Sequence, residues 1–128
     1  MQFLALIYQK EKIQKDFSKE EWGKIYAEYQ AVGKELKDKG LLKAGYGLQP
    51  TTAAKTVRSR EGMISIQEGP AYSTEDSLSG VNLIEAPDMQ TALEAAGKLP
   101  SARWGSVEVR PLMEYRSTPA ETYQTAKT

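Results

Sequence analysis

The amino-acid sequence predicts a single α+β domain in which two amphipathic helices cover one face of an antiparallel sheet. Three observations predict it: strand-like apolar segments near both ends, two helical stripes between them, and a length of 128 residues, which suits one domain. The 40% hydrophobic and 27% charged content is that of an ordinary globular chain. We divide the chain into a domain of residues 1–114 and a flexible tail of residues 115–128.

The first predicted strand runs from Met1 to Tyr8 and is apolar on both faces, so we expect it at the centre of the sheet. Its two rows are Phe3, Ala5 and Ile7 on one side and Leu4, Leu6 and Tyr8 on the other. The segment is too short for a signal peptide, and no later apolar run approaches the roughly 20 residues that span a bilayer. We therefore expect a cytoplasmic protein that does not bind membranes.

A helix is predicted between Ser18 and Gly40. Ser18 and Glu21 have the spacing of a capping box, Phe17 and Trp22 that of a hydrophobic staple, and Gly40 that of a C-terminal cap. The stripe that we expect in the core is Trp22, Ile25, Tyr26, Tyr29, Val32 and Leu36. The expected surface ion pairs are Glu20–Lys24, Lys34–Asp38 and Glu35–Lys39.

The sequence at the centre of the chain predicts a short extended segment at residues 44–48 followed by a β-hairpin. The hairpin strands are predicted at Thr52–Arg58 and Met63–Gln67, joined by residues 59–62, where Gly62 can adopt a positive φ.

Another strand, a helix and a last strand complete the predicted domain. The strand is Gly80–Glu85, the helix begins at Pro87–Asp88 and ends at Pro100, and the last strand is Trp104–Arg110. The stripe expected to face the core from this helix is Met89, Ala92, Leu93, Ala96 and Leu99.

This order is the split β-α-β-β-α-β arrangement of a ferredoxin-like fold with an extra hairpin. Two helices cover only one face of such a sheet, and the other face still carries apolar side chains of the first strand. We therefore expect a homodimer whose sheets pack face to face as a dimeric α+β barrel. The alternative is a monomer whose exposed sheet face is a ligand cleft.

The composition excludes several chemistries. Without Cys or His the chain has no disulfide, thiolate nucleophile, imidazole base or Cys/His metal site. The formal net charge of zero, from 17 basic and 17 acidic residues, gives no general attraction for nucleic acid. The acidic residues are scattered, and Gly45-Tyr46-Gly47 lacks the setting of a dinucleotide fingerprint, so we expect neither a metal nor a cofactor.

Several polar side chains remain as candidates for chemistry or binding. Glu68 precedes Gly69-Pro70 at a strand end and is the candidate general acid or base; the alternative is that it caps the loop backbone. Glu108 and Arg110 share one strand face, where Arg110 can hold a ligand carboxylate or phosphate; the alternative is a structural ion-pair network. Three tyrosines are candidates for lining a ligand pocket: Tyr8, Tyr46 and Tyr72. The alternative is that they pack at the edge of the core or at a dimer interface.

Four segments in order resemble the YCII-related proteins of the DGPF branch, whose name comes from a loop reading Asp-Gly-Pro-Phe-Ala-Glu-Thr-Lys-Glu. They are MQFLALIY (1–8), GLQP (47–50), EGPAYSTE (68–75) and ARWGSVEVRP (102–111). Glu68 stands where that family has Asp, and Ala71-Tyr72 where Phe-Ala is usual. The resemblance implies a ferredoxin-like dimeric barrel and a bacterial cytoplasmic origin. It also implies an undefined activity and, often, a gene beside an extracytoplasmic-function sigma factor.

Other YCII-like proteins carry a His–Asp pair associated with acid–base catalysis, which this chain cannot supply. We therefore expect a dimer that binds a small polar or anionic ligand in a cleft lined by Glu68, Tyr72, Glu108 and Arg110. The alternatives are an enzyme that uses the Glu68 carboxylate and a regulatory partner of a sigma factor.

Overall fold

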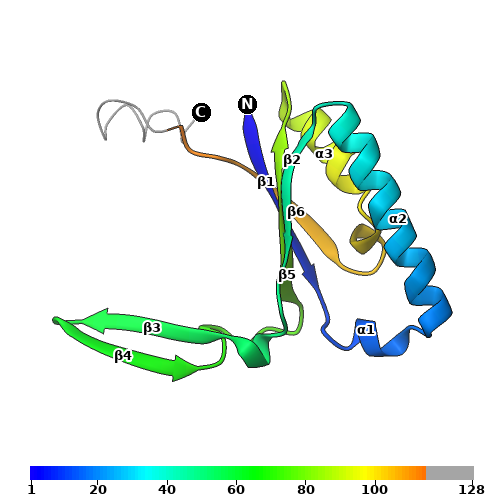
Figure 1. Cartoon of the computed structure of the whole chain (residues 1–128). Coiled ribbons are helices and arrows are strands. Elements are labelled where there is room, and N and C mark those ends of the chain that lie inside the picture. Colours follow the sequence, from blue (N-terminus) through cyan, green and yellow to red (C-terminus); the bar gives the residue numbers. More distant parts are fainter. Residues whose placement is uncertain (115–128) are drawn as a thin grey trace.

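The computed structural model describes residues 1–114 and confirms the α+β architecture (Figure 1). The predicted tail lies outside the described residues. The strands are β1 (Gln2–Gln9), β2 (Leu42–Gly47), β3 (Lys55–Arg60), β4 (Met63–Glu68), β5 (Ser77–Glu85) and β6 (Ser106–Pro111). The helices are α1 (Ile13–Asp16), α2 (Lys19–Asp38) and α3 (Met89–Gly97), with 3-10 turns η1 (Thr51–Ala53) and η2 (Pro100–Arg103). None of the described helices is both long and apolar enough to cross a bilayer.

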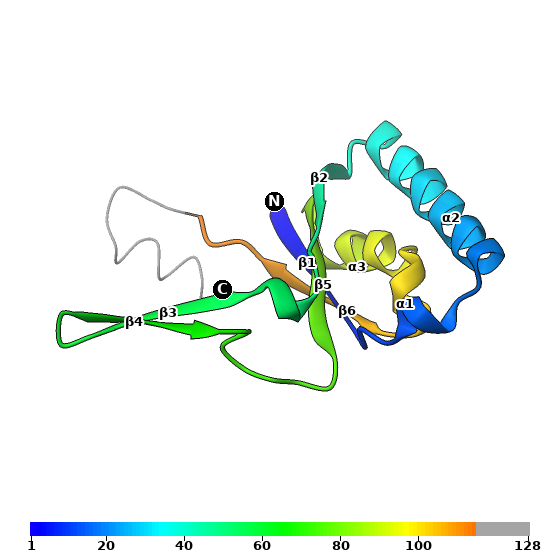
Figure 2. The same ribbon diagram turned by 60° about the horizontal axis from the view of Figure 1, so that its bottom comes forward.

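Four strands form one antiparallel sheet in the order β2-β5-β1-β6. This is the strand order of a ferredoxin-like fold, with β1, β2, β5 and β6 as its four strands, so the predicted topology is confirmed. The hairpin β3–β4 is an insertion that forms its own two-stranded sheet. The helices lie on one side of the main sheet and the hairpin projects from the other (Figures 1 and 2).

The core lies between the sheet and the helices. Phe3 and Ala5 of β1 are fully buried there, as is Ile84 of β5, which confirms the central position of β1. The helices contribute Leu36, Ala92, Ala95 and Ala96 to the same cluster. Small alanine side chains let α3 approach the sheet closely.

Both ends of α2 follow the sequence prediction. The Ser18 hydroxyl accepts from the Glu21 backbone N–H at 3.1 Å, and the Glu21 carboxylate accepts from the Ser18 N–H at 3.2 Å. The Phe17 ring stacks on Trp22, with 6.0 Å between ring centroids. Gly40 has φ of 73°, and the following N–H, of Leu41, donates to the Leu36 carbonyl, as in a Schellman motif. Two of the predicted surface ion pairs form, Lys34–Asp38 and Glu35–Lys39.

The predicted core stripe of α2 is wrong at two residues of its first half. Ile25 and Leu36 are buried, but Tyr26 is 62% exposed and Trp22 is 39% exposed. The reason is that this half of α2 is held against η2 and not centred on the sheet. There Arg103 donates to both carboxylate oxygens of Glu28, at 2.7 and 3.1 Å.

The stripe of α3 is rotated relative to the prediction. Leu93 is exposed, whereas Ala95, which was not in the predicted stripe, is buried. The helix also ends at Gly97, and Leu99 is buried just beyond it as the chain turns into η2.

The hairpin is confirmed, with its first strand shifted toward the C-terminus and its second strand beginning at Met63 as predicted. Its loop has only two residues, Glu61 and Gly62, whose positive φ values of 51° and 78° are those of a type I′ turn. Thr52 belongs to η1 and not to β3. The last strand begins at Ser106 rather than Trp104, because the Trp104 N–H still donates to the Ser101 carbonyl of η2.

The N-terminus of α3 supports a pH-dependent prediction. The backbone N–H of Thr91 donates to the Asp88 side chain at 2.8 Å and lowers the pKa of that carboxyl from its usual 3.8. The ionised form therefore adds stability above pH 3.8, and this contribution is lost as the pH falls through the lower folded-state pKa. We expect Asp88→Asn, which keeps a capping oxygen but does not titrate, to lose less stability between pH 5 and pH 2.

Urea unfolding across this pH range measures the difference. Equal losses in the two proteins would show that the Asp88 cap does not contribute to acid sensitivity.

Candidate functional site

The face of the main sheet opposite the helices is uncovered by any described helix (Figure 2). Register and side-chain alternation place six partly exposed apolar side chains on it. We call this surface the open face: Leu4, Leu6, Tyr8, Leu78, Val81 and Leu83. Partly exposed apolar side chains that cluster on one surface typically mark an interaction site.

Four of the predicted site residues belong to strands of this face. Tyr8 is part of it, and Tyr46, opposite Val81 in register, lies at its β2 edge. Glu108 and Arg110 lie opposite Leu6 and Leu4, and their charged groups are 3.9 Å apart. The predicted same-face pair therefore exists.

Glu68 lies elsewhere, at the base of the hairpin. Its carboxylate is 3.4 Å from the Lys55 ammonium on the neighbouring strand, and the side chain is 79% exposed. The next residue, Gly69, has φ of 92° and turns the chain into the loop that leads to β5. In the single chain this carboxylate faces solvent beside a lysine.

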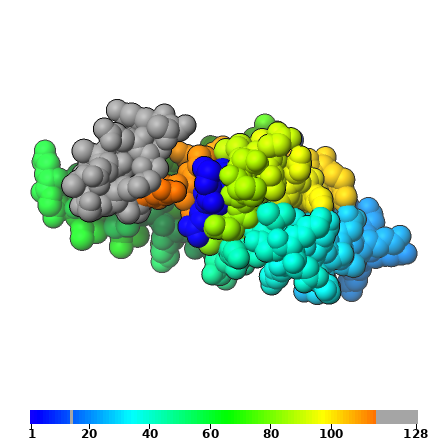
Figure 3. All heavy atoms as spheres, turned by 90° about the horizontal axis from the view of Figure 1, so that it is seen from above, coloured from blue at the N-terminus to red at the C-terminus, as the bar shows by residue number. Residues whose placement is uncertain are grey.

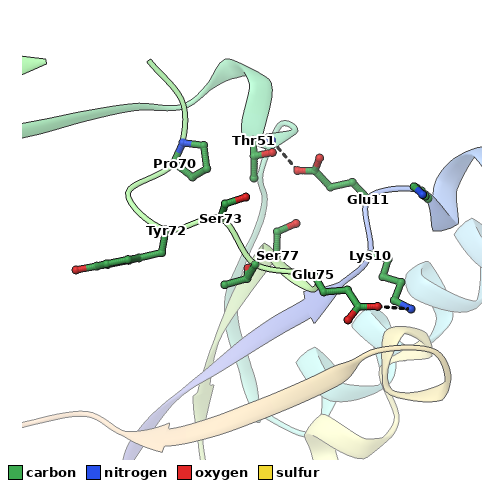
Figure 4. A pocket seen from close by; sticks show the side chains of 10 residues that line it. Lys10, Glu11, Thr51, Pro70, Tyr72, Ser73, Glu75 and Ser77 are labelled. Atoms are coloured by element: carbon green, nitrogen blue, oxygen red, sulfur yellow. Dashed lines mark hydrogen bonds and ion pairs between the residues drawn. The ribbon is translucent and has the colours of Figure 1, made fainter. Parts of the chain in front are cut away.

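A cavity of about 470 Å³ lies beyond the C-terminal end of β1, next to the loop between β4 and β5 (Figure 4). Residues that follow β1, the first residue of η1, the loop and the start of β5 all contribute to its wall. The wall consists of Lys10, Glu11, Lys12, Thr51, Pro70, Tyr72, Ser73, Thr74, Glu75 and Ser77. Of the six predicted site residues, Tyr72 alone is part of it.

Two polar contacts hold the cavity wall together (Figure 4). The Lys10 ammonium lies 2.9 Å from the Glu75 carboxylate, which raises the pKa of Lys10 and ties the loop to the chain after β1. The Glu11 carboxylate accepts from the Thr51 backbone N–H at 2.7 Å, and this bond lowers the pKa of Glu11. Both carboxylates are therefore already engaged within the wall.

The remaining groups give the cavity its chemical character. Lys12 forms no ion pair with any residue in the described range 1–114, so its charge is available to a ligand. Hydroxyl groups of Thr51, Ser73 and Ser77 offer both donors and acceptors. The Tyr72 ring forms the outer rim, points away from Glu11 and Glu75 in Figure 4, and is 82% exposed.

The single chain thus does not assemble the one cleft that was predicted from Glu68, Tyr72, Glu108 and Arg110. The Glu108–Arg110 pair faces solvent on the open face. Glu68 instead pairs with Lys55 at the hairpin base, and of the four residues only Tyr72 lines the cavity. The separation arises because the hairpin is a separate sheet that carries Glu68 away from β6.

The sequence analysis did not identify Lys10, Glu11 and Lys12, which follow the first predicted strand, or Glu75. A usable signal was present in the segment EGPAYSTE, whose last residue is Glu75. Within residues 1–114 no three acidic side chains gather in a way that could hold a metal ion.

Comparison with known proteins identifies a family and proteins similar to this chain. The family model for the YCII-related domain matches residues 1–116. An uncharacterized protein of Rhizobium meliloti (strain 1021) is 35% identical over 118 residues, which cover 91% of this chain and 95% of that protein.

A solved structure is similar at lower identity. It is a 5-chloro-2-hydroxyhydroquinone dehydrochlorinase from Burkholderia phenoliruptrix in complex with 2,5-dihydroxybenzoquinone. The likeness covers 90% of this chain and 96% of that one, with a TM-score of 0.49 and 14% sequence identity.

Proposed function

This chain belongs to the YCII-related domain family, and from that premise we propose that it is a homodimeric binding protein for a small anionic molecule. The observation that carries the proposal is the cavity beside β1, whose wall contains a lysine without an ion-pair partner in the described chain and several hydroxyl groups.

The dimer is proposed from the open face. Its apolar side chains lie on the two central strands and cannot be covered by α2 or α3, which pack on the opposite side (Figure 1). A second sheet packed against it at about 10 Å would bury these side chains. A stable dimer needs about 800 Å² of contact on each partner, an area that a four-stranded sheet face can supply.

The ligand class follows from the cavity wall. The Glu11 carboxylate already accepts a hydrogen bond from Thr51, and the Glu75 carboxylate is already paired with Lys10. The Lys12 ammonium is therefore the charge in the wall that a ligand can neutralise. A carboxylate or phosphate group is the natural counter-ion, with hydroxyl donors to satisfy its remaining oxygens. The Tyr72 ring offers a planar surface to an aromatic ligand at the rim.

We test this proposal with 4-hydroxybenzoate and inorganic phosphate as probes. Isothermal titration calorimetry of the unmodified protein is expected to detect binding of at least one of them. Lys12→Met removes the ammonium and is expected to weaken that binding at least about tenfold, because a charge-assisted hydrogen bond contributes roughly 1.5–3 kcal/mol.

Lys24→Met on α2 is the matched control, because it removes a lysine charge at a residue outside the cavity wall. It is expected to leave probe affinity within about twofold. Equal affinity of the Lys12 and Lys24 variants would rule out Lys12 as the anion-binding group, and no binding of either probe would contradict the ligand class.

A further inference from the structure

The inserted hairpin has one apolar face and one polar face. Strand register places Val57, Ile64 and Ile66 on one face, together with the Lys55–Glu68 pair. The three apolar side chains are 66%, 72% and 69% exposed. We call these three side chains the apolar row. The opposite face consists of Thr56, Arg58, Arg60, Met63, Ser65 and Gln67.

The hairpin is well formed despite this exposure. Six residue pairs are in register, the turn is of the tight two-residue kind, and the base is fastened to the loop after β4. At the base the Gly69 N–H donates to the Ala54 carbonyl at 2.8 Å, and the Thr56 hydroxyl donates to the Gly69 carbonyl at 2.9 Å. Because an isolated two-stranded hairpin is only marginally stable in water, this one needs a surface to pack against.

The position of the hairpin identifies that surface. It projects from the side of the main sheet that carries the open face (Figures 1 and 2), and in the space-filling view it lies at the opposite end of the molecule from the helices (Figure 3). A six-residue strand is about 20 Å long, whereas packed sheets are about 10 Å apart. If a second copy packs on the open face, the hairpin of the first copy therefore lies along the side of the second copy and extends beyond its sheet.

We propose that residues 55–68 form an arm whose apolar row packs on the second copy of the chain in the dimer. The arrangement is reciprocal under two-fold symmetry, so each subunit receives the arm of the other. This inference rests on the proposed dimer but adds a separate contact. The two sheets form the centre of the interface, and each arm packs against the side of the other subunit.

The test is the dimer dissociation constant of the triple variant Val57→Thr, Ile64→Thr and Ile66→Thr, measured by sedimentation equilibrium. Threonine keeps the β-branched shape that strands favour, so the hairpin itself is retained. We expect the dissociation constant to rise at least about tenfold, because buried apolar side chains carry much of the binding energy of an interface.

The matched control places three threonines on the other face: Arg58→Thr, Arg60→Thr and Met63→Thr. It is expected to change the dissociation constant by no more than about threefold. The arm contact would be ruled out, with the dimer left intact, if the apolar-row triple variant had the same dissociation constant as the unmodified protein. It would also be ruled out if the two triple variants weakened the dimer equally. A monomeric unmodified protein would overturn the dimer and the arm together.

Hydrogen exchange gives a second readout that does not depend on the triple variant. The amides of residues 55–68 are expected to exchange more slowly in the dimer than in a monomer produced by a charge on the open face, while the amides of α3 exchange equally in both. Equal exchange of the arm in both forms would contradict the proposed contact.

Discussion

Leu6→Lys is expected to convert the proposed dimer to a monomer. Leu6 lies at the middle of the open face, opposite Val81 on one neighbouring strand and Glu108 on the other. In the folded monomer the new ammonium faces solvent and can pair with Glu108. In a face-to-face dimer it would be buried beside its symmetry mate, at a cost of several kcal/mol.

The dissociation constant of the dimer is therefore expected to rise about a thousandfold or more. Tyr26→Lys is the matched control, because this side chain is exposed on α2, on the other side of the sheet. It should leave the dissociation constant unchanged. A Leu6→Lys protein that remains as tightly dimeric as the unmodified one would show that the open face is not the interface.

Gly105→Ala is expected to be the most destabilising single substitution among the glycines of the described domain. Gly105 leads into β6, and a Cβ at this position would overlap the backbone carbonyl oxygen of Tyr8 in the central strand. The strands can relieve the overlap only by separating, which breaks part of the β1–β6 pairing. We expect a loss of about 3 kcal/mol in the free energy of unfolding, the upper part of the range for overpacked sites.

Gly33→Ala provides the matched control in α2, since an added Cβ there meets nothing within 4 Å. It is expected to stabilise the protein by roughly 0.5–1 kcal/mol, because alanine favours a helix over glycine. Urea unfolding at one fixed protein concentration measures both variants, since the stability of the proposed dimer would depend on concentration. Equal stability of the Gly105→Ala and unmodified proteins would contradict the close β1–β6 approach.

Local sequence signals predict most of this fold because they act over a few residues. The Ser18–Glu21 cap, the left-handed Gly40 and the hairpin with Gly62 all form as predicted. The exposure of Tyr26 was not predictable, because periodicity identifies the apolar stripe of a helix but not which part of it lies over the sheet.

The candidate site is less visible in the sequence for a related reason. Glu108 and Arg110 share a face by alternation alone, and the structure places them so. The cavity instead joins Lys10, Thr51 and Glu75, which are far apart in the chain and share one wall because β1 and β2 both pair with β5. No short motif carries that long-range contact, so it could not be inferred from spacing.

Native mass spectrometry of the purified protein tests the central claim, that a second copy covers the open face. One chain has a mass of 14.2 kDa. We predict a species of twice this mass at micromolar concentration, which Leu6→Lys reduces to a single chain. A single-chain mass for the unmodified protein across the same concentrations would contradict the account.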